Sequence, residues 1–103
     1  MRIVLKDVAG CLNSENVREL VRQLEYPPEI REEKTDQIIA EYREHPDQPI
    51  LGVECGGDLV GLIGLVLKAP AAAVIRHIVI RRDRRGQGIG REMIACICRM
   101  YSL

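Results

Sequence analysis

The residues best suited to chemistry lie in one short stretch, residues 81–94, which reads RRDRRGQGIGREMI. It holds five arginines and three glycines, the latter at positions 86, 88 and 90. The glycines stand where an apolar run gives way to a helical pattern, so no Cβ atoms shield the backbone N–H groups of that turn. Unpaired N–H groups at a helix start, the helix dipole and flanking arginines together attract a phosphate. The stretch therefore predicts a pyrophosphate-binding loop between a strand and a helix.

Several other interpretations of this loop fit its residues less well. A P-loop needs Gly-Lys-Ser/Thr, and Ile89-Gly90-Arg91 stands there instead. The dinucleotide fingerprint fails because Arg91 takes its third glycine position. A nucleic-acid surface would be broader, whereas this chain has a formal net charge of zero and no Trp or Phe. The remaining alternative is a glycine-rich helix start whose arginines are merely solvated.

The elements that must position this loop follow from the apolar pattern of the 103-residue chain, which is long enough for one domain with one core. Apolar runs predict strands, helical periodicity predicts helices, and Pro27-Pro28 ends the first helix. The predicted order is β-α-α-β-β-β-α, with strands at 2–6, 50–55, 59–67 and 74–80 and helices over about 15–24, 29–44 and from 88 onward. Thr35-Asp36 could restart the second helix. Three consecutive strands indicate an α+β fold with a mixed, mostly antiparallel sheet flanked by helices.

Composition adds further expectations about partners and location. Residues 13–47 hold ten acids against five bases, and residues 76–99 hold seven arginines. The early acidic excess suits a cationic substrate, although a solvated helix face explains it more simply. The four cysteines lack metal-ligand spacing, so we expect no metal and free thiols in a reducing cytoplasm. The sequence shows no signal peptide and no run long enough for a membrane span.

The loop also resembles a known family. Arg85-Gly86-Gln87-Gly88-Ile89-Gly90 matches the Q/R-x-x-G-x-G/A signature of the GNAT superfamily of acetyl-CoA-dependent N-acetyltransferases. The preceding strand Ile78-Val79-Ile80 and the strand–turn–strand at 53–61 are similar to the family's as well. The resemblance covers almost all of the chain, in the family's order of elements, and implies a partial GNAT-like domain over residues 1–103.

This resemblance implies a function and a set of coenzyme contacts. The chain would supply the acetyl-CoA-binding half of an N-acetyltransferase that passes the acetyl group to a primary amine by direct attack. Backbone groups of the strand at 78–80 would meet the pantetheine arm and the thioester carbonyl. The loop would hold the pyrophosphate, so that the coenzyme contacts are Ile78, Val79, Ile80, Arg85, Gly86, Gln87, Gly88, Ile89, Gly90 and Arg91.

The catalytic groups are less well matched. The family's tyrosine acid lies in a C-terminal part beyond residue 103, and Tyr101 does not match it. Where some members place a carboxylate base, this chain has Val74-Ile75-Arg76. His77 is the nearest group that titrates near neutrality, and it is the candidate base. With regular alternation it shares a face with Ile75 and Val79, where a packed, helix-covered histidine is the alternative.

The remaining expectations concern assembly, alternative functions and partners. The strand at 74–80 would have one bare, apolar edge, which predicts a homodimer or swapped assembly covering it, or else a fragment of a longer enzyme. The alternative function is a non-catalytic acyl-CoA-binding module. A nucleic-acid-binding domain is a third and weaker reading of the arginine cluster, and we expect neither nucleic acid nor membrane as a partner.

Overall fold

Four antiparallel strands form one sheet in the order β1-β2-β3-β4 in the computed structural model, which describes residues 2–68, 70 and 72–101. The strands are β1 Val4–Asp7, β2 Ile50–Cys55, β3 Asp58–Lys68 and β4 Ala72–Ile80. The β2–β3 hairpin turns through Gly56 and Gly57, whose φ angles of +60° and +88° are those that glycine adopts without strain. β4 lies at one edge of this sheet.

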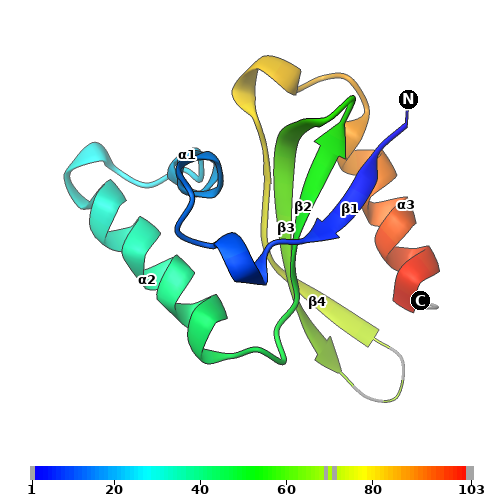
Figure 1. Cartoon of the computed structure of the whole chain (residues 1–103), viewed down its shortest axis with the longest axis horizontal. Helices are drawn as coiled ribbons and strands as arrows, with labels where there is room; N and C mark the ends of the chain where they lie inside the picture. Colours follow the sequence, from blue (N-terminus) through cyan, green and yellow to red (C-terminus); the bar gives the residue numbers. More distant parts are fainter. Residues whose placement is uncertain (1, 69, 71, 102–103) are drawn as a thin grey trace.

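Three helices cover the two faces of the sheet, as Figure 1 shows, with α1 and α2 on one side and α3 on the other. They are α1 Glu15–Arg22, α2 Arg31–Glu44 and α3 Ile89–Tyr101, with short 3-10 turns at Ala9–Cys11, Pro28–Ile30 and Arg82–Arg84. Ser14 caps α1, because its hydroxyl accepts a hydrogen bond from the Val17 N–H. The second helix runs through Thr35 without a restart, and the Thr35 hydroxyl donates to the Arg31 carbonyl.

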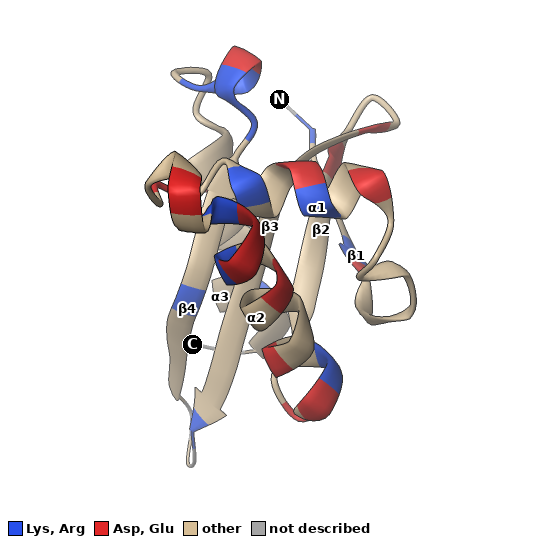
Figure 2. Cartoon of the chain, turned by 90° about the vertical axis from the view of Figure 1, so that its left-hand side faces the viewer, with Lys and Arg blue, Asp and Glu red and all other residues tan. Residues whose placement is uncertain are grey.

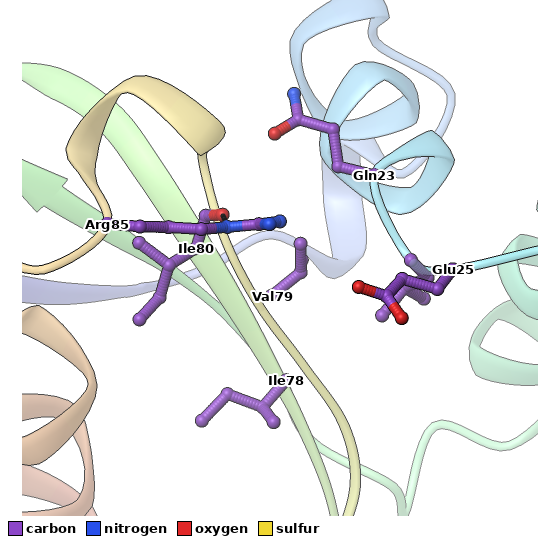
Figure 3. Close-up of a pocket in the computed structure, with 7 residues that line it drawn as sticks. Gln23, Glu25, Ile78, Val79, Ile80 and Arg85 are labelled. Atoms are coloured by element: carbon purple, nitrogen blue, oxygen red, sulfur yellow. Dashed lines mark hydrogen bonds between the residues drawn. The ribbon is translucent and has the colours of Figure 1, made fainter.

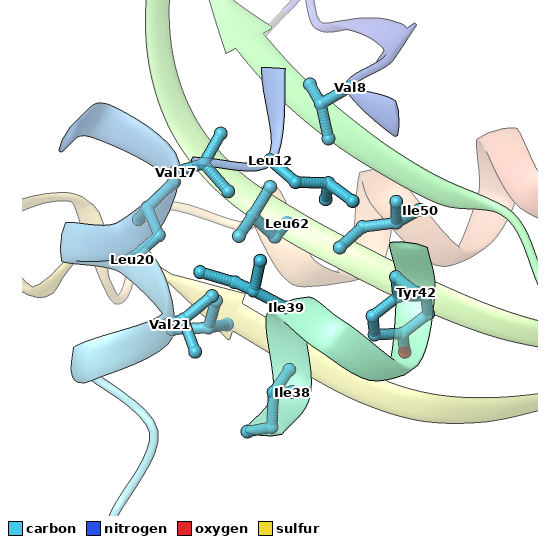
Figure 4. Packing of buried hydrophobic residues seen from close by; sticks show 11 residues of the cluster. Val8, Leu12, Val17, Leu20, Val21, Ile38, Ile39, Tyr42, Ile50 and Leu62 are labelled. Carbon is cyan, nitrogen blue, oxygen red and sulfur yellow. The ribbon is translucent and has the colours of Figure 1, made fainter. Parts of the chain in front are cut away.

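The hydrophobic core forms two layers, one on each face of the sheet. The layer under α1 and α2 contains Val8, Leu12, Val17, Leu20, Val21, Ile38, Ile39, Tyr42, Ile50, Leu62 and Val79 (Figure 4). The layer under α3 contains Leu51, Val53, Val60, Ile63, Leu65, Ile89, Met93 and Ile97. Both layers are nearly all aliphatic, as expected for a chain without Phe or Trp.

Ion pairs join α1 to α2 on their outer faces, where Figure 2 shows charges of both signs. Arg18 lies 2.7 Å from Asp36 and 3.1 Å from Glu32, and Arg22 contacts Glu32 and Glu15. Hydrogen bonds from Arg22 and Arg18 hold the pKa of the Glu32 carboxyl below its ordinary value. Of the ten acids in residues 13–47, Glu32 and Asp36 are therefore used in contacts between the two helices.

A β-bulge in β4 breaks the regular alternation expected around His77. Gly64 pairs with His77 and the next residue, Leu65, pairs with Ile75, so Arg76 is the extra residue. Paired residues share a face of the sheet, which puts Ile75 on the α3 face with Leu65. His77 keeps the helix α2 face with Val79, but the expectation that it shares that face with Ile75 was wrong.

Candidate functional site: a glycine loop and the cleft beside β4

The chain leaves β4, makes the 3-10 turn Arg82–Arg84 and enters α3 through the glycine loop, which we define as residues 85–90. Gly86 and Gly88 have φ angles of +79° and +83°, in the left-handed region that disfavours residues with a Cβ. A Cβ at either position would meet no atom within 4 Å. These two glycines are therefore required by backbone conformation, and the space in front of them is open.

The backbone N–H groups of the loop are available to a ligand. Within the part of the chain that the structure describes, the N–H groups from Gly86 to Gly90 have no hydrogen-bond acceptor, whereas the Glu92 N–H already reaches the Gly88 carbonyl at 3.2 Å. Ile89 is 2% exposed, so its side chain anchors the start of α3 in the core. Free donors at the positive end of a helix form an anion site.

The arginines around the loop divide into those held by the protein and those free to approach a ligand. Arg81 is held by Asp83, at 2.6 Å, and by the Leu59 carbonyl, at 3.2 Å. Arg85 donates from Nε to the Ile80 carbonyl at 2.8 Å, and its exposed guanidinium crosses one end of a cleft. Arg91 is exposed on the first turn of α3. The family resemblance named Arg85 and Arg91 among the coenzyme contacts; Arg85 begins the loop and Arg91 directly follows it.

A cleft of about 340 Å³ opens next to the loop. One wall is the end of β4, residues 78–80, and the other is the turn after α1, with Gln23, Leu24 and Glu25; Arg85 completes it (Figure 3). Gln23 ties the turn after α1 to the 3-10 turn that follows β4, because its Oε1 accepts a hydrogen bond from the Arg82 N–H at 2.8 Å. The sequence predicted the β4 wall but missed the second one, because nothing in the local pattern marks residues that directly follow a helix as cleft residues.

The edge of β4 supplies backbone groups to this cleft. The Ile80 carbonyl accepts from Arg85, so it points away from β3. Backbone groups two residues apart on a strand point the same way, which directs those of Ile78 outward as well. An extended, polar ligand arm can therefore pair with β4 as an additional strand would.

His77 lies outside this cleft. Its Nδ1 is 2.7 Å from the Tyr42 hydroxyl, and the two rings meet edge-on at a centroid distance of 5.5 Å. Burial lowers the pKa of His77 and raises that of Tyr42, which is 2% exposed. Here His77 is a packed residue under α2. It also faces a separate hollow of about 180 Å³ that includes Glu41 and Arg76.

Two further features concern metals and membranes. Among residues 2–68, 70 and 72–101, no three His, Cys, Asp or Glu side chains gather as a metal site would require. Within the same ranges, no helix has both the length and the apolar character needed to cross a bilayer.

Comparison with known proteins places this arrangement in a family. Residues 15–101 match the model of the acetyltransferase (GNAT) family. The match spans most of the chain and includes α1, α2, the sheet from β2 to β4, the glycine loop and α3. The chain belongs to the GNAT acetyltransferase family, and its mixed α+β fold is the fold expected from the sequence.

Individual relatives agree with this assignment. An uncharacterized N-acetyltransferase in the lysA 3′ region of Bacillus methanolicus is 28% identical over 75 residues, which are 73% of this chain and 62% of that protein. The PaiA N-acetyltransferase of Thermoplasma acidophilum, solved with coenzyme A, has a TM-score of 0.70 at 19% identity, over 99% of this chain and 73% of that one.

A Bacillus cereus structure described as an IAA acetyltransferase has a TM-score of 0.68 at 16% identity, over 98% of this chain and 59% of its own. At these identities the structural likeness shows the fold. The chain spans about three fifths of the length of the Bacillus methanolicus protein and of the Bacillus cereus structure.

Proposed function

We propose that this chain is the acetyl-CoA-binding half of a GNAT N-acetyltransferase that transfers an acetyl group to a primary amine. The observation that carries the proposal is the row of free N–H groups from Gly86 to Gly90, directly after Arg85, which lines the cleft beside β4. Family membership supports the same reading. The unit proposed is one partial GNAT-like domain over residues 1–103.

The coenzyme contacts follow from the order of these features along the cleft. The loop amides, with Arg85 and Arg91, hold the pyrophosphate, and the outward backbone groups of β4 at Ile78 and Ile80 pair with the pantetheine arm. The full set is Ile78, Val79, Ile80, Arg85, Gly86, Gln87, Gly88, Ile89, Gly90 and Arg91. Because the loop lies at the carboxyl end of β4, the arm runs back along the strand and brings the thioester toward Ile78.

The reaction proposed is direct transfer. The neutral amine attacks the thioester carbon, a C–N bond forms as the C–S bond breaks, the nitrogen gives up one proton, and the coenzyme thiolate takes one up. Backbone N–H groups of β4 are suited to polarise the thioester oxygen. His77 is held by Tyr42 under α2, and we do not propose it as the base.

Calorimetric titration with coenzyme A tests the binding half of the proposal. We expect binding by the wild type and its loss in Gly88→Asp, which places a carboxylate among the loop donors. A Gly57→Asp variant, also at a positive φ but in the β2–β3 turn, is the matched control and should retain binding. Release of free thiol from acetyl-CoA with a panel of amines then separates an enzyme from a non-catalytic acyl-CoA-binding module. A folded wild type that fails to bind at millimolar coenzyme would contradict the proposal.

An assembly and a location are proposed alongside. Val74 and Ile75 are 48% and 41% exposed on the edge strand, ahead of the residues assigned to the coenzyme. We propose that a second copy covers this first half of the 74–80 edge, as a homodimer or swapped assembly. Sedimentation showing a stable monomer would argue against it.

The four cysteines form no disulfide, which supports the proposed cytoplasmic location.

A further inference from the structure

The wall of the cleft opposite β4 carries one acidic side chain, Glu25, in the turn between α1 and α2. It is the only carboxylate among the described residues that line the cleft. Figure 3 shows its oxygens directed toward Val79 and the space between the turn and β4. The facing wall, from Ile78 to Ile80, presents apolar side chains and strand backbone. A ligand arm lying on β4 therefore has a carboxylate across from it.

The charge of Glu25 is not used by the protein. Five acids of α1 and α2 form ion pairs with Arg18, Arg22 or Arg76, namely Glu15, Glu19, Glu32, Asp36 and Glu41. The cations nearest to the turn in sequence are used elsewhere: Arg31 donates to the Tyr26 carbonyl, and the Lys34 ammonium lies over the Tyr26 ring at 6.0 Å. Among the described residues Glu25 has no ion-pair partner and no hydrogen-bond donor, so it is free to meet a cation from the ligand.

Glu25 and Arg85 are side chains of opposite charge that line different parts of the cleft. Arg85 lies where β4 runs into the glycine loop, which suits an anion. Glu25 belongs to the turn that continues away from the loop toward Tyr26 and the hollow beside His77. The phosphate site at the loop and the carboxylate across from Val79 thus lie at different places beside β4 (Figure 3).

We propose that Glu25 binds the ammonium group of the acceptor and makes this site selective for aliphatic amines that are positively charged near neutral pH. This inference rests on the proposed coenzyme site, because it is the bound arm that brings the reacting thioester opposite Glu25. Glu25 is a specificity-determining residue in this scheme. It orients the acceptor, and the step that deprotonates the nitrogen is separate.

The test uses two coenzyme A thioethers and needs no turnover. One carries an aminopropyl group on the sulfur, and the other a hydroxypropyl group of nearly the same size without the charge. In calorimetry with the wild type, we expect the aminopropyl compound to bind about tenfold more tightly, as a single charge-assisted contact would give. In Glu25→Gln the preference should fall to about one while the affinity for coenzyme A itself stays unchanged.

A matched variant and the remaining outcomes complete the design. Glu29→Gln removes an exposed carboxylate from the same turn, outside the residues that line the cleft, and should keep the preference. Equal affinities for the two thioethers in the wild type, or a preference that survives in Glu25→Gln, would overturn the inference and leave the proposed function standing. Failure of coenzyme A and both thioethers to bind would overturn the two together.

Discussion

Replacing Gly88 with alanine should damage coenzyme binding much more than folding, and the structure supplies the comparison needed to separate the two. At Gly88 the φ angle is +83° and an added Cβ would meet no atom within 4 Å. The substitution therefore causes no clash, and its cost to the free energy of unfolding is that of a left-handed L-residue, about 1–2 kcal/mol.

Gly57 is the internal reference for that cost. Its φ angle is +88°, and a Cβ there would also meet nothing within 4 Å. It lies in the β2–β3 turn and is not among the residues that line the cleft. Gly57→Ala should thus lose the same free energy of unfolding, about 1–2 kcal/mol, in urea denaturation.

The two variants should separate in calorimetry with coenzyme A. The methyl group of Gly88→Ala enters the space in front of the loop amides and displaces the pyrophosphate from at least one of them. Loss of one hydrogen bond to a charged group, about 1.5–3 kcal/mol, corresponds to roughly 10- to 100-fold weaker binding. Gly57→Ala should bind within about twofold of the wild type. Equal affinities in Gly88→Ala and the wild type, with both proteins folded, would refute the assignment of the loop.

Three further predictions concern the packing of Tyr42 beneath α2. Gly64→Ala should lower the free energy of unfolding by about 3 kcal/mol or more, because its Cβ would lie 1.9 Å from the Tyr42 hydroxyl oxygen. In the control Gly10→Ala, where the Cβ would meet no atom within 4 Å, the free energy of unfolding should change by less than about 0.5 kcal/mol. Comparable urea midpoints for the two variants would contradict this packing. Tyr42→Phe should cost about 1 kcal/mol by removing the bond to His77, and an unchanged midpoint would show that the bond contributes nothing. Burial lowers the pKa of His77 in the folded state, so the unfolded chain binds the proton more readily and stability should fall as the pH drops below about 6.5. The free energy of unfolding, measured in urea from about pH 7.5 to about pH 5, should depend less steeply on pH in His77→Gln, and an equal pH dependence would contradict this account.

The parts of this fold that the sequence predicts are those controlled by local patterns. The apolar spacing of α1 and the glycine pair at the β2–β3 turn each act over a few residues, and both elements were predicted close to their observed positions. The glycine loop was predicted for the same reason, since positive φ angles and a helix start are local properties. The first strand was placed two residues early, at 2–6 instead of Val4–Asp7.

The parts that were missed depend on contacts between distant segments. The bulge at Arg76 arises from the pairing of β4 with β3, and no residue type in β4 predicts it. Tyr42 and His77 are 35 positions apart, and only the docking of α2 on the sheet brings them together. The Gln23 and Glu25 wall likewise becomes part of a cleft only when the turn after α1 lies beside β4.

Because the N–H groups of the glycine loop are unpaired, their hydrogen-exchange rates should show whether a ligand is bound there. Backbone amides without an acceptor exchange their hydrogens with solvent quickly, whereas those in the ladder between β3 and β4 exchange only when the sheet opens. In the free protein, Gly86 to Gly90 should therefore label with deuterium far sooner than Leu62 or Val79. A bound anion that accepts from these amides would slow the labelling of the loop selectively. Mass spectrometry or NMR of the unmodified chain can thus detect its ligand without any label on the ligand.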